Sequence, residues 1–211
     1  MWERLFALAY DPFIWLAELA GMRERRARLA AQARGRTVEL GSGTGLNLSH
    51  YPAEVGELIL TEPDPAMRLR LEHRARRADR SVRVLADSAE ALSMADGSVD
   101  TVVSTLVLCT VDDPGRALDE IARVLRPDGQ LLFIEHVRAE SARLAGWQDR
   151  LERPWRRFAV GCHCNRSTLR AIRDAGFTAD AQTARWRGMP PIVAPLISGT
   201  ARLAGSAPAQ T

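Results

Sequence analysis

The stretch "VELGSGTGLN", residues 38–47, places three glycines at alternate positions behind a short apolar segment that predicts a β-strand at 36–40. Because glycine has no Cβ, such a loop lets a bound molecule approach the backbone closely. A phosphate-binding loop would need a lysine, and the chain contains none. A dinucleotide-binding loop would need a third glycine where Leu46 stands. The loop therefore favours a ligand without a phosphate.

Three carboxylates indicate which ligand this is. Glu39 precedes the glycines, where it can meet a cationic amine. Glu62 closes the strand predicted at 58–62, where it can accept both hydroxyls of a ribose. Asp87 closes the strand predicted at 82–87, where its side chain and the following amides can meet an adenine. Amine, ribose and adenine together favour S-adenosylmethionine; the alternative role for each acid is a helix cap, and it stays open for Asp87.

Strands and helices alternate along the chain, which predicts a parallel sheet with helices on both faces. Beyond the strands above, we expect strands at 98–108, at 130–137 after a turn at 126–129, and, more weakly, at 177–186 and 192–203. We expect helices after the glycine loop and at 12–32, 66–76, 114–125, 142–158 and 166–176, with Asp11 capping the first of these ranges and Asn165 the last.

Composition excludes several classes of protein. The 211 residues are 46% hydrophobic, which is enough for one domain with an ample core. All 29 basic residues are arginines, and 26 carboxylates nearly balance them. The densest basic run, 68–80, contains no aromatic residue that could stack on a base, so we interpret it as a solvated helix face and expect no nucleic-acid partner.

No apolar run approaches the roughly 18 residues that a membrane span needs. The first 21 residues carry four charged side chains and do not have the pattern of a signal peptide, so we expect a cytoplasmic protein. Three cysteines are too few for a disulfide framework, and we expect free thiols. The sequence predicts no oligomeric state.

Four segments in order resemble the motifs of class I methyltransferases: "VELGSGTG" (38–45), "TEPDPAM" (61–67), "LADSAEALSMADGSVDTVVSTLVLCTV" (85–111) and "LRPDGQLLFIEHV" (125–137). The resemblance implies a Rossmann-like α/β fold. Its sheet has seven mostly parallel strands in the order 3-2-1-4-5-7-6, with strand 7 antiparallel. It also implies S-adenosylmethionine as the cofactor. The residues expected to bind it are Tyr10, Glu39, Gly41, Ser42, Gly43, Thr44, Gly45, Asn47, Glu62, Pro63, Met67, Asp87, Ser88, Ala89, Thr105 and Leu106.

A narrower resemblance runs through 95–140, "RPW" (153–155) and "GCHCNRSTL" (161–169), and reaches about residue 177. These stretches are similar to the methyltransferase-like family seven, whose members methylate alkyl thiols. The animal members begin with a longer hydrophobic anchor, whereas this chain has a short amphipathic start. Bacterial relatives of this general type also methylate quinones, phospholipid head groups and other small molecules. The resemblance therefore favours a thiol acceptor, with a hydroxyl, an amine or a lipid head group as alternatives.

The chemistry needs few groups, because the methyl of a sulfonium is already activated and positioning carries much of the catalysis. A thiol, with a pKa of about 8.5, is already partly ionised near neutral pH. His136 ends the fifth strand and is the first candidate for proton acceptor or thiolate stabiliser, with a purely structural histidine as the equal alternative. Cys109 is a candidate for the acceptor site, or a small packed residue.

The loop at 161–166, which includes Arg166, is expected to form part of a lid over the acceptor site, and Tyr10 is a further expected acceptor contact. Cys162 either contacts the acceptor or is a buried structural residue. The "CHC" run of this loop offers at most three metal ligands crowded into three residues, so we expect no metal. An Asn/Asp-Pro-Pro-aromatic stretch after the fourth strand, typical of enzymes that methylate base or glutamine amino groups, is absent.

The N-terminal segment is rich in aromatic residues: Trp2, Phe6, Tyr10, Phe13 and Trp15. We interpret residues 1–33 as a lid over an apolar acceptor, with peripheral contact to a membrane surface as an alternative. Residues 34–137 form the cofactor-binding core, 138–205 the acceptor side of the same domain, and 206–211 a disordered tail. A silent cofactor-binding module and a nucleotide-dependent oxidoreductase remain as other classes.

Overall fold

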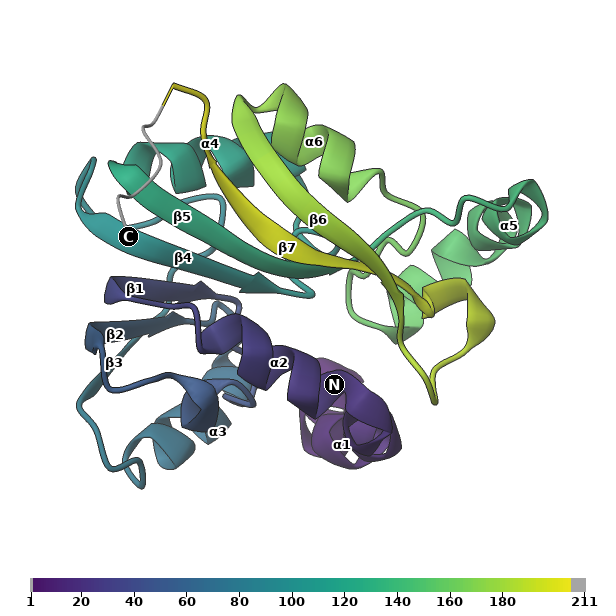
Figure 1. Cartoon of the computed structure of the whole chain (residues 1–211). Coiled ribbons are helices and arrows are strands. Elements are labelled where there is room, and N and C mark those ends of the chain that lie inside the picture. Colours follow the sequence, from purple (N-terminus) through teal and green to yellow (C-terminus); the bar gives the residue numbers. More distant parts are fainter. Residues whose placement is uncertain (1, 206–211) are drawn as a thin grey trace.

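The computed structural model describes residues 2–205, and the side chains of residues 10–205. Its centre is a seven-stranded sheet in the order β3-β2-β1-β4-β5-β7-β6 (Figure 1). The strands are β1 (Gly35–Leu40), β2 (Val55–Thr61), β3 (Val82–Leu85), β4 (Val99–Thr105), β5 (Leu125–His136), β6 (Phe177–Arg185) and β7 (Pro195–Leu203). β7 is antiparallel to β5 and β6, and the other pairs are parallel. The predicted fold class and strand order are confirmed; the expected tail, 206–211, lies outside the described residues.

Helices cover both faces of the sheet (Figure 1). On one face α4 (Pro114–Val124) and α6 (Thr168–Asp174) bury a core that includes Ile121 and Phe133. On the other face α2 (Arg23–Ala30) and α3 (Pro65–Ala75) bury a second core that includes Leu71 and Leu132. Strands that are buried on both faces are typical of a parallel sheet.

Two Asp-Pro pairs start the helices that follow β2 and β4. The Asp64 carboxylate accepts the amides of Ala66 and Met67 at 2.9 and 2.8 Å, with proline in the first helical turn of α3. Asp113 caps α4 in the same way. Side-chain caps of this kind fix where a helix begins. The cap Asp64 lies two residues after Glu62, and its amide donates to the Glu62 carboxylate, which fixes the direction in which Glu62 leaves the strand.

The N-terminal segment differs from the prediction. A single helix over 12–32 was expected, but α1 (Trp2–Ala17) runs through Pro12 and a kinked π-helical turn, η1 (Glu18–Met22), separates it from α2. The kink lies at Gly21, whose φ of 114° is open to glycine and strained for other residues. The chain therefore has two N-terminal helices at an angle.

Asp11 is not a helix cap, as predicted, because it lies inside α1. Its carboxylate accepts the Thr44 hydroxyl at 2.6 Å and the guanidinium groups of Arg70 and Arg74 at 3.1 Å. These contacts to the glycine loop and to α3 hold α1 in place from outside the helix. The sequence could not show them, since the partners lie 33 to 63 residues away.

Three smaller predictions are also wrong. The glycine loop is followed by turns and a short 3-10 helix, η2 (Leu48–His50), where an α-helix was expected. The turn predicted at 126–129 is a bulge inside β5, whose pairing with β4 shifts register there. Asn165 does not cap α6; it donates a hydrogen bond to Asp149 of α5 (Ala142–Phe158).

Within residues 2–205, none of the helices has both the length and the apolar character that crossing a membrane requires. The cytoplasmic location, the three-part division of the domain and peripheral membrane contact stay predictions.

Candidate active site

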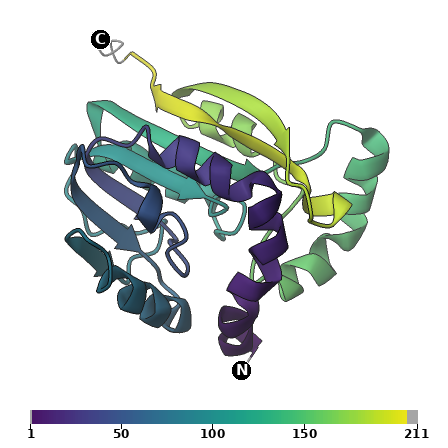
Figure 2. The same cartoon turned by 60° about the horizontal axis from the view of Figure 1, so that its bottom comes forward.

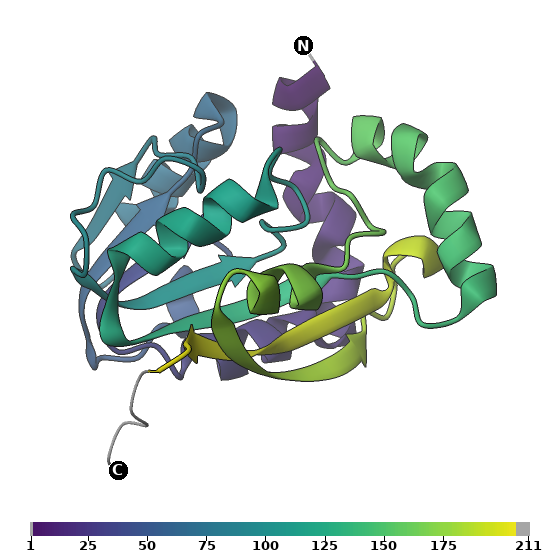
Figure 3. The ribbon, with the colours of Figure 1, turned by 90° about the horizontal axis from the view of Figure 1, so that it is seen from above.

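Two adjoining hollows lie where β1, β2, β4 and β5 end. One is a cavity of about 210 Å³ with aromatic walls, here called the aromatic cavity, and the other is an open cleft of about 590 Å³. Both hollows are lined by Gly41, Glu62, Leu106, Thr110 and Val160, so they form one continuous site. Helices α1 and α5 extend beyond this edge of the sheet (Figures 2 and 3). Ligands of open α/β sheets bind at the carboxyl ends of the strands, as here.

The glycine loop holds its backbone open to this site. Gly41 and Gly43 have φ values of 47° and 56°, in the left-handed region that glycine adopts without strain. A Cβ on Gly41 would come within 2.9 Å of the Val107 side chain, so only glycine lets the loop pack on the turn after β4. A Cβ on Gly43 would meet nothing within 4 Å. The space beside Gly43 is therefore free for a ligand.

Glu62 stands directly after β2 and lines both hollows. One carboxylate oxygen accepts the Gly43 amide at 2.8 Å, and the other accepts the Asp64 amide at 2.9 Å. Burial raises the pKa of Glu62, and these two amides partly oppose that rise. Since each carboxylate oxygen has two lone pairs, both can still accept a hydrogen bond from a ligand.

Glu39 lies beneath the glycine loop and lines neither hollow. Its two oxygens accept the Asn47 amide at 3.0 Å and the Tyr51 hydroxyl at 2.6 Å. Burial raises the pKa of Glu39 to about 7, opposed by hydrogen bonds from Tyr51 and Asn47 and by the charge of Arg26. Asn47 also bonds Arg26 and Thr105. Glu39, Asn47 and Thr105 thus support the loop from below, and direct contact with the cofactor stays a prediction.

The remaining loop residues are held by neighbouring elements. The Ser42 amide donates to Thr61 at 2.8 Å, and its hydroxyl donates to the Glu39 carbonyl. Thr44 is bonded to Asp11 of α1. Gly45 faces a separate surface hollow on the far side of the loop. These three residues shape the loop and do not line the two hollows of the site.

A buried carboxylate on β5 organises the turn after β4. Glu135 accepts the Ser104 hydroxyl at 2.6 Å and the amides of Val107, Leu108 and Cys109, each at 3.1 Å. Leu106, which opens this turn, has a φ of 62°, which is unusual for a residue other than glycine. Four hydrogen bonds to one carboxylate hold the strained turn in the position where Leu106 lines both hollows.

Asp87, the third carboxylate in the sequence prediction, forms hydrogen bonds within its own loop. Asp87 accepts both the amide and the hydroxyl of Ser93, at 2.8 and 2.6 Å, and lines neither hollow. Ser88 and Ala89, which follow it, line the open cleft together with Pro63. Contact of these neighbours and of Asp87 with the adenine of the cofactor stays a prediction.

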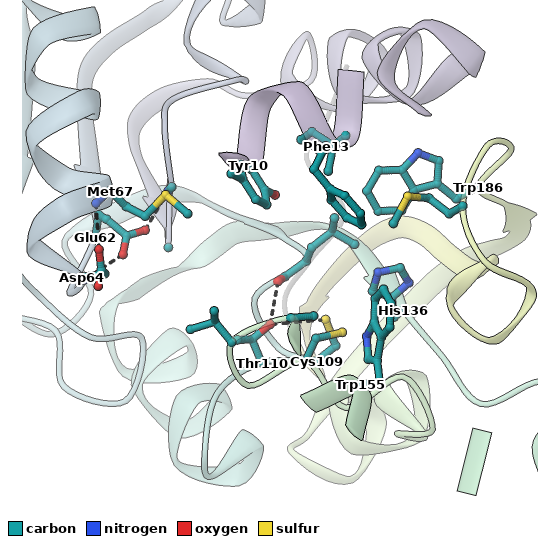
Figure 4. Close-up of a pocket in the computed structure, with 18 residues that line it drawn as sticks. Tyr10, Phe13, Glu62, Asp64, Met67, Cys109, Thr110, His136, Trp155 and Trp186 are labelled. Carbon is teal, nitrogen blue, oxygen red and sulfur yellow. Dashed lines mark hydrogen bonds between the residues drawn. The ribbon is translucent and has the colours of Figure 1, made fainter. Parts of the chain in front are cut away.

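The aromatic cavity is closed by side chains from distant segments (Figure 4). Tyr10 and Phe13 come from α1, Trp155 from α5 and Trp186 from the segment after β6. Met67 lies on the opposite side, beside Glu62 (Figure 4). The Trp186 indole donates to the Ala17 carbonyl at 3.2 Å, which ties α1 to this wall. Tyr10 and Phe13 of the predicted lid thus line the cavity, and the role of this segment as a lid stays a prediction. The side chains of Trp2 and Phe6 lie outside the described residues.

His136 forms part of the same wall, with its ring stacked on Trp186 at 5.6 Å between centroids. It is 4% exposed, and its Nδ1 has no hydrogen-bond partner. Burial lowers the pKa of His136 to about 4, opposed by the carbonyls of Pro195 and Val193. The ring is therefore uncharged at neutral pH. An uncharged imidazole can accept a proton or a hydrogen bond, but it cannot stabilise a thiolate by its charge.

The cysteines are free, and two of them line the aromatic cavity: Cys109 and Cys162. Both thiols are buried, and contact of Cys109 with an acceptor stays a prediction. Arg166 lines a different hollow, and its guanidinium donates to the Leu108 carbonyl at 2.9 Å. His163 pairs with Glu152 at 2.9 Å, and residues 2–205 contain no cluster of three or more metal-ligating side chains.

Several lining residues were not predicted, above all Trp155, Trp186 and Met189. Trp155 lies in the "RPW" segment that carries part of the family resemblance, and this was the only signal available for it. Trp186 and Met189 lie in a loop without a motif, and only the packing of β6 and β7 brings them to the site.

Comparisons with known proteins agree with this geometry. Residues 38–133 match the family model described as "Methyltransferase domain". The chain is 36% identical to human thiol S-methyltransferase TMT1B over 171 residues, which are 74% of this chain and 69% of the human protein. It is 37% identical to the rat protein of the same name over 147 residues, which are 67% of this chain and 59% of the rat protein, so the match spans less than two thirds of that relative.

The chain is also similar to one further sequence relative and to one solved structure. The chain is 32% identical to phosphatidylethanolamine N-methyltransferase of Cereibacter sphaeroides over 165 residues, 75% of this chain and 78% of that protein. Its fold matches the crystal structure of an S-adenosylmethionine-dependent methyltransferase from Thermotoga maritima, described as a possible histamine N-methyltransferase. The TM-score is 0.69 at 25% identity, and the match covers 93% of this chain and 96% of the other.

The fold, the glycine loop and Glu62 define a class I methyltransferase, and the relatives agree: this chain belongs to the S-adenosylmethionine-dependent methyltransferases. S-adenosylmethionine is therefore its cofactor, as the sequence predicted. Within that class, the chain is similar to the thiol S-methyltransferases.

Proposed function

We propose that this enzyme transfers the methyl group of S-adenosylmethionine to the thiol of a small, apolar molecule held in the aromatic cavity. The observation that carries the proposal is the cavity itself, which is walled by aromatic side chains, contains a buried neutral imidazole, and opens onto the cleft expected to hold the cofactor. Apolar cavities with a few placed polar groups are typical of small-molecule sites. The similarity to thiol S-methyltransferases supports the accepting atom.

The residues present fit the cofactor. The open position beside Gly43 admits a ligand against the backbone, and Glu62 has acceptor capacity left for the ribose hydroxyls. Pro63, Ser88 and Ala89 line the cleft where we expect the adenine. When bound, S-adenosylmethionine supplies a sulfonium-activated methyl group.

The chain's own residues then act on the acceptor. Aromatic side chains exclude water and orient an apolar acceptor towards the cleft. His136, which is uncharged, accepts the hydrogen bond of the acceptor S–H and passes the proton towards solvent. We expect Tyr10 and Cys109 to contact the acceptor from two sides, with Cys162 beside them. Arg166 holds the turn after β4 through the Leu108 carbonyl, and we propose a positioning role for it.

A panel of methyl acceptors with labelled cofactor tests the accepting atom. We expect alkyl and aryl thiols to be methylated in preference to matched phenols and amines. If phenols or amines react while thiols do not, the proposal is wrong. Binding of S-adenosylhomocysteine with no turnover on any acceptor would instead indicate a silent module.

A second candidate, methylation of a lipid head-group amine, is favoured by the similarity to phosphatidylethanolamine N-methyltransferase. Aromatic faces also attract cationic ammonium groups. Vesicles that contain phosphatidylethanolamine belong in the same panel, and a rate on them above that on every thiol would favour this alternative.

The role of His136 is tested by His136→Ala. We expect kcat to fall by about 100-fold, the lower range for general acid–base catalysis, while the affinity for S-adenosylhomocysteine stays unchanged. His73→Ala is the matched control, because His73 is exposed on α3. If kcat survives in His136→Ala, the residue has only a structural role.

A further inference from the structure

Two buried polar atoms in the wall of the aromatic cavity have no hydrogen-bond partner. Among the described side chains, these two atoms are His136 Nδ1 and Trp155 Nε1, whereas Arg36 Nε, which also makes no well-directed hydrogen bond, is ion-paired with Glu57 at 2.9 Å. His136 and Trp155 line the same cavity. Buried polar groups are nearly always paired, so each exception needs a physical explanation. A ligand that supplies both missing partners explains the two in the cavity together.

Trp155 is well placed to meet the acceptor. It lies on α5, with its ring packed beside Phe158 at 5.7 Å between centroids. Figure 4 shows Trp155 and His136 on the same side of the cavity, opposite Glu62. An acceptor that reaches His136 therefore also reaches the indole of Trp155.

We propose that the indole N–H of Trp155 donates a hydrogen bond to the sulfur of the acceptor thiol and thereby favours its thiolate form. The inference rests on the proposed function and adds the group that recognises the accepting atom. Hydrogen bonds to ionised acceptors are about twice as strong as those to neutral ones. The N–H therefore binds the thiolate more tightly than the thiol, and ionisation of the bound acceptor becomes easier. The proton leaves towards solvent by way of the neutral His136.

The other hydrogen-bond donors of the cavity are already engaged or lie elsewhere. The Thr110 hydroxyl donates to the Leu106 carbonyl at 3.0 Å, and the Trp186 indole donates to Ala17. Among the lining residues that the structure describes there is no arginine or lysine. Trp155 Nε1 is thus a buried donor of this wall without a hydrogen-bond partner, and the neighbouring thiol of Cys162 is the group with which an acceptor sulfur would compete for it.

The Cys162 thiol shows how the neighbouring groups of this cavity act on the pKa of a sulfur atom. Cys162 lies beside Trp155, and its pKa is lowered first by a hydrogen bond from Cys109 and then by the Trp155 indole, against the effect of burial. Other titratable groups also face the acceptor: Tyr10 from α1, Glu62 and Asp64 after β2, Cys109 after β4 and His136 on β5. Glu135 raises the pKa of Cys162 and Arg166 lowers it. The indole N–H is therefore one of several influences on a sulfur here, and it is the one that a single substitution removes.

The direct test measures the pKa of a bound thiol without turnover. A chromophoric arenethiol, whose thiolate absorbs visible light, is titrated with pH in the presence of S-adenosylhomocysteine. Trp155→Phe keeps an aromatic ring and removes the N–H. We expect the pKa of the bound thiol to rise by about one unit, a tenfold loss of ionisation. Trp147→Phe, an exposed tryptophan on the same helix, should leave this pKa unchanged. An unchanged pKa in Trp155→Phe would overturn the inference.

A second measurement uses the unmutated protein, so it does not depend on how the variant folds. In ¹⁵N-tryptophan-labelled enzyme with S-adenosylhomocysteine, the arenethiol should move one of the five indole N–H resonances downfield. The corresponding methyl thioether, which cannot ionise, should move it less. If thiol and thioether move it equally, the N–H does not recognise a thiolate.

Rates on thiols of graded pKa separate this inference from the proposed function. In Trp155→Phe, kcat/KM should fall most for weakly acidic alkyl thiols and least for arenethiols that are already ionised. An equal fall for all thiols would indicate a structural role for Trp155. If the unmutated enzyme methylates no thiol at all, the proposed function itself fails.

Discussion

The two halves of the site are built in different ways. The cofactor half consists of backbone and carboxylates from short segments at the ends of β1 and β2, and its polar atoms are already bonded within the protein: Gly43 to Glu62, and Glu39 to Asn47 and Tyr51. The acceptor half consists of aromatic side chains from distant segments, and it retains two buried polar atoms without partners.

This difference indicates two different roles. A network whose polar atoms already have partners within the protein is rigid, and it can present one fixed surface to one cofactor. A wall of aromatic rings with few polar atoms excludes water and selects the acceptor mainly by shape and apolar contact. Glu135 joins the halves, because the turn that it holds, from Leu106 to Cys109, lines both hollows.

We therefore expect the largest effect on stability from the removal of the Glu135 carboxylate. Glu135→Ala leaves three buried amides without an acceptor, and we expect it to lower the free energy of unfolding by about 3 kcal/mol or more. Urea denaturation measures this. Ser104→Ala is the matched control, since it removes one hydrogen bond to Glu135 and leaves the amides paired. A loss no larger than that of the control would show that the halves do not depend on Glu135.

The next effect is a pH dependence of the free energy of unfolding, which arises from Glu39 in the cofactor half. The pKa of Glu39 is raised from 4.5 to about 7, so the folded protein binds more protons than the unfolded chain between these values. The stability contributed by Glu39 therefore falls as the pH rises from 4.5 to 7, by about 3 kcal/mol in all.

Glu39→Gln should abolish this fall. Denaturation at several pH values should show the variant gaining stability relative to the unmutated protein as the pH rises to 7. His136 acts in the opposite direction, because its lowered pKa of about 4 makes the unfolded chain bind the extra proton between pH 4 and 6.5. A Glu39→Gln difference that does not change with pH would mean that the carboxylate is ionised throughout.

The smallest effect distinguishes residues within the cofactor half. Glu62→Ala should weaken the binding of S-adenosylhomocysteine by at least about tenfold, because a buried acceptor of hydroxyl groups is lost. Asp87→Ala should weaken it less, since the Asp87 carboxylate is bonded to Ser93 and lines neither hollow. Calorimetry measures both constants. Equal losses would return Asp87 to the role predicted from the sequence, and no loss in Glu62→Ala would mean that the ribose site is elsewhere.

Sequence reasoning predicted most of the fold, because strand and helix patterns are local and periodic. It was wrong where a distant partner overrides a local signal. Pro12 marked a helix start, yet α1 continues through it while Asp11 binds Thr44, Arg70 and Arg74. Asp87 accepts two hydrogen bonds from Ser93 at one carboxylate oxygen, and its predicted contact with the cofactor stays a prediction.

The sequence by itself determined the fold class, the cofactor and the loop that faces it, since the alternating glycines and Glu62 all lie within 38–62. The tertiary structure decided the acceptor site. Tyr10, His136, Trp155 and Trp186 are spread over 177 positions of the chain. They meet in one cavity because α1 packs on α3, α5 packs on the short helix η3 (Pro191–Val193), and β7 pairs with β5. The structure also decided that His136 is uncharged and that the Trp155 indole lies buried beside Cys162, because burial and neighbours are properties of the fold and not of any local pattern.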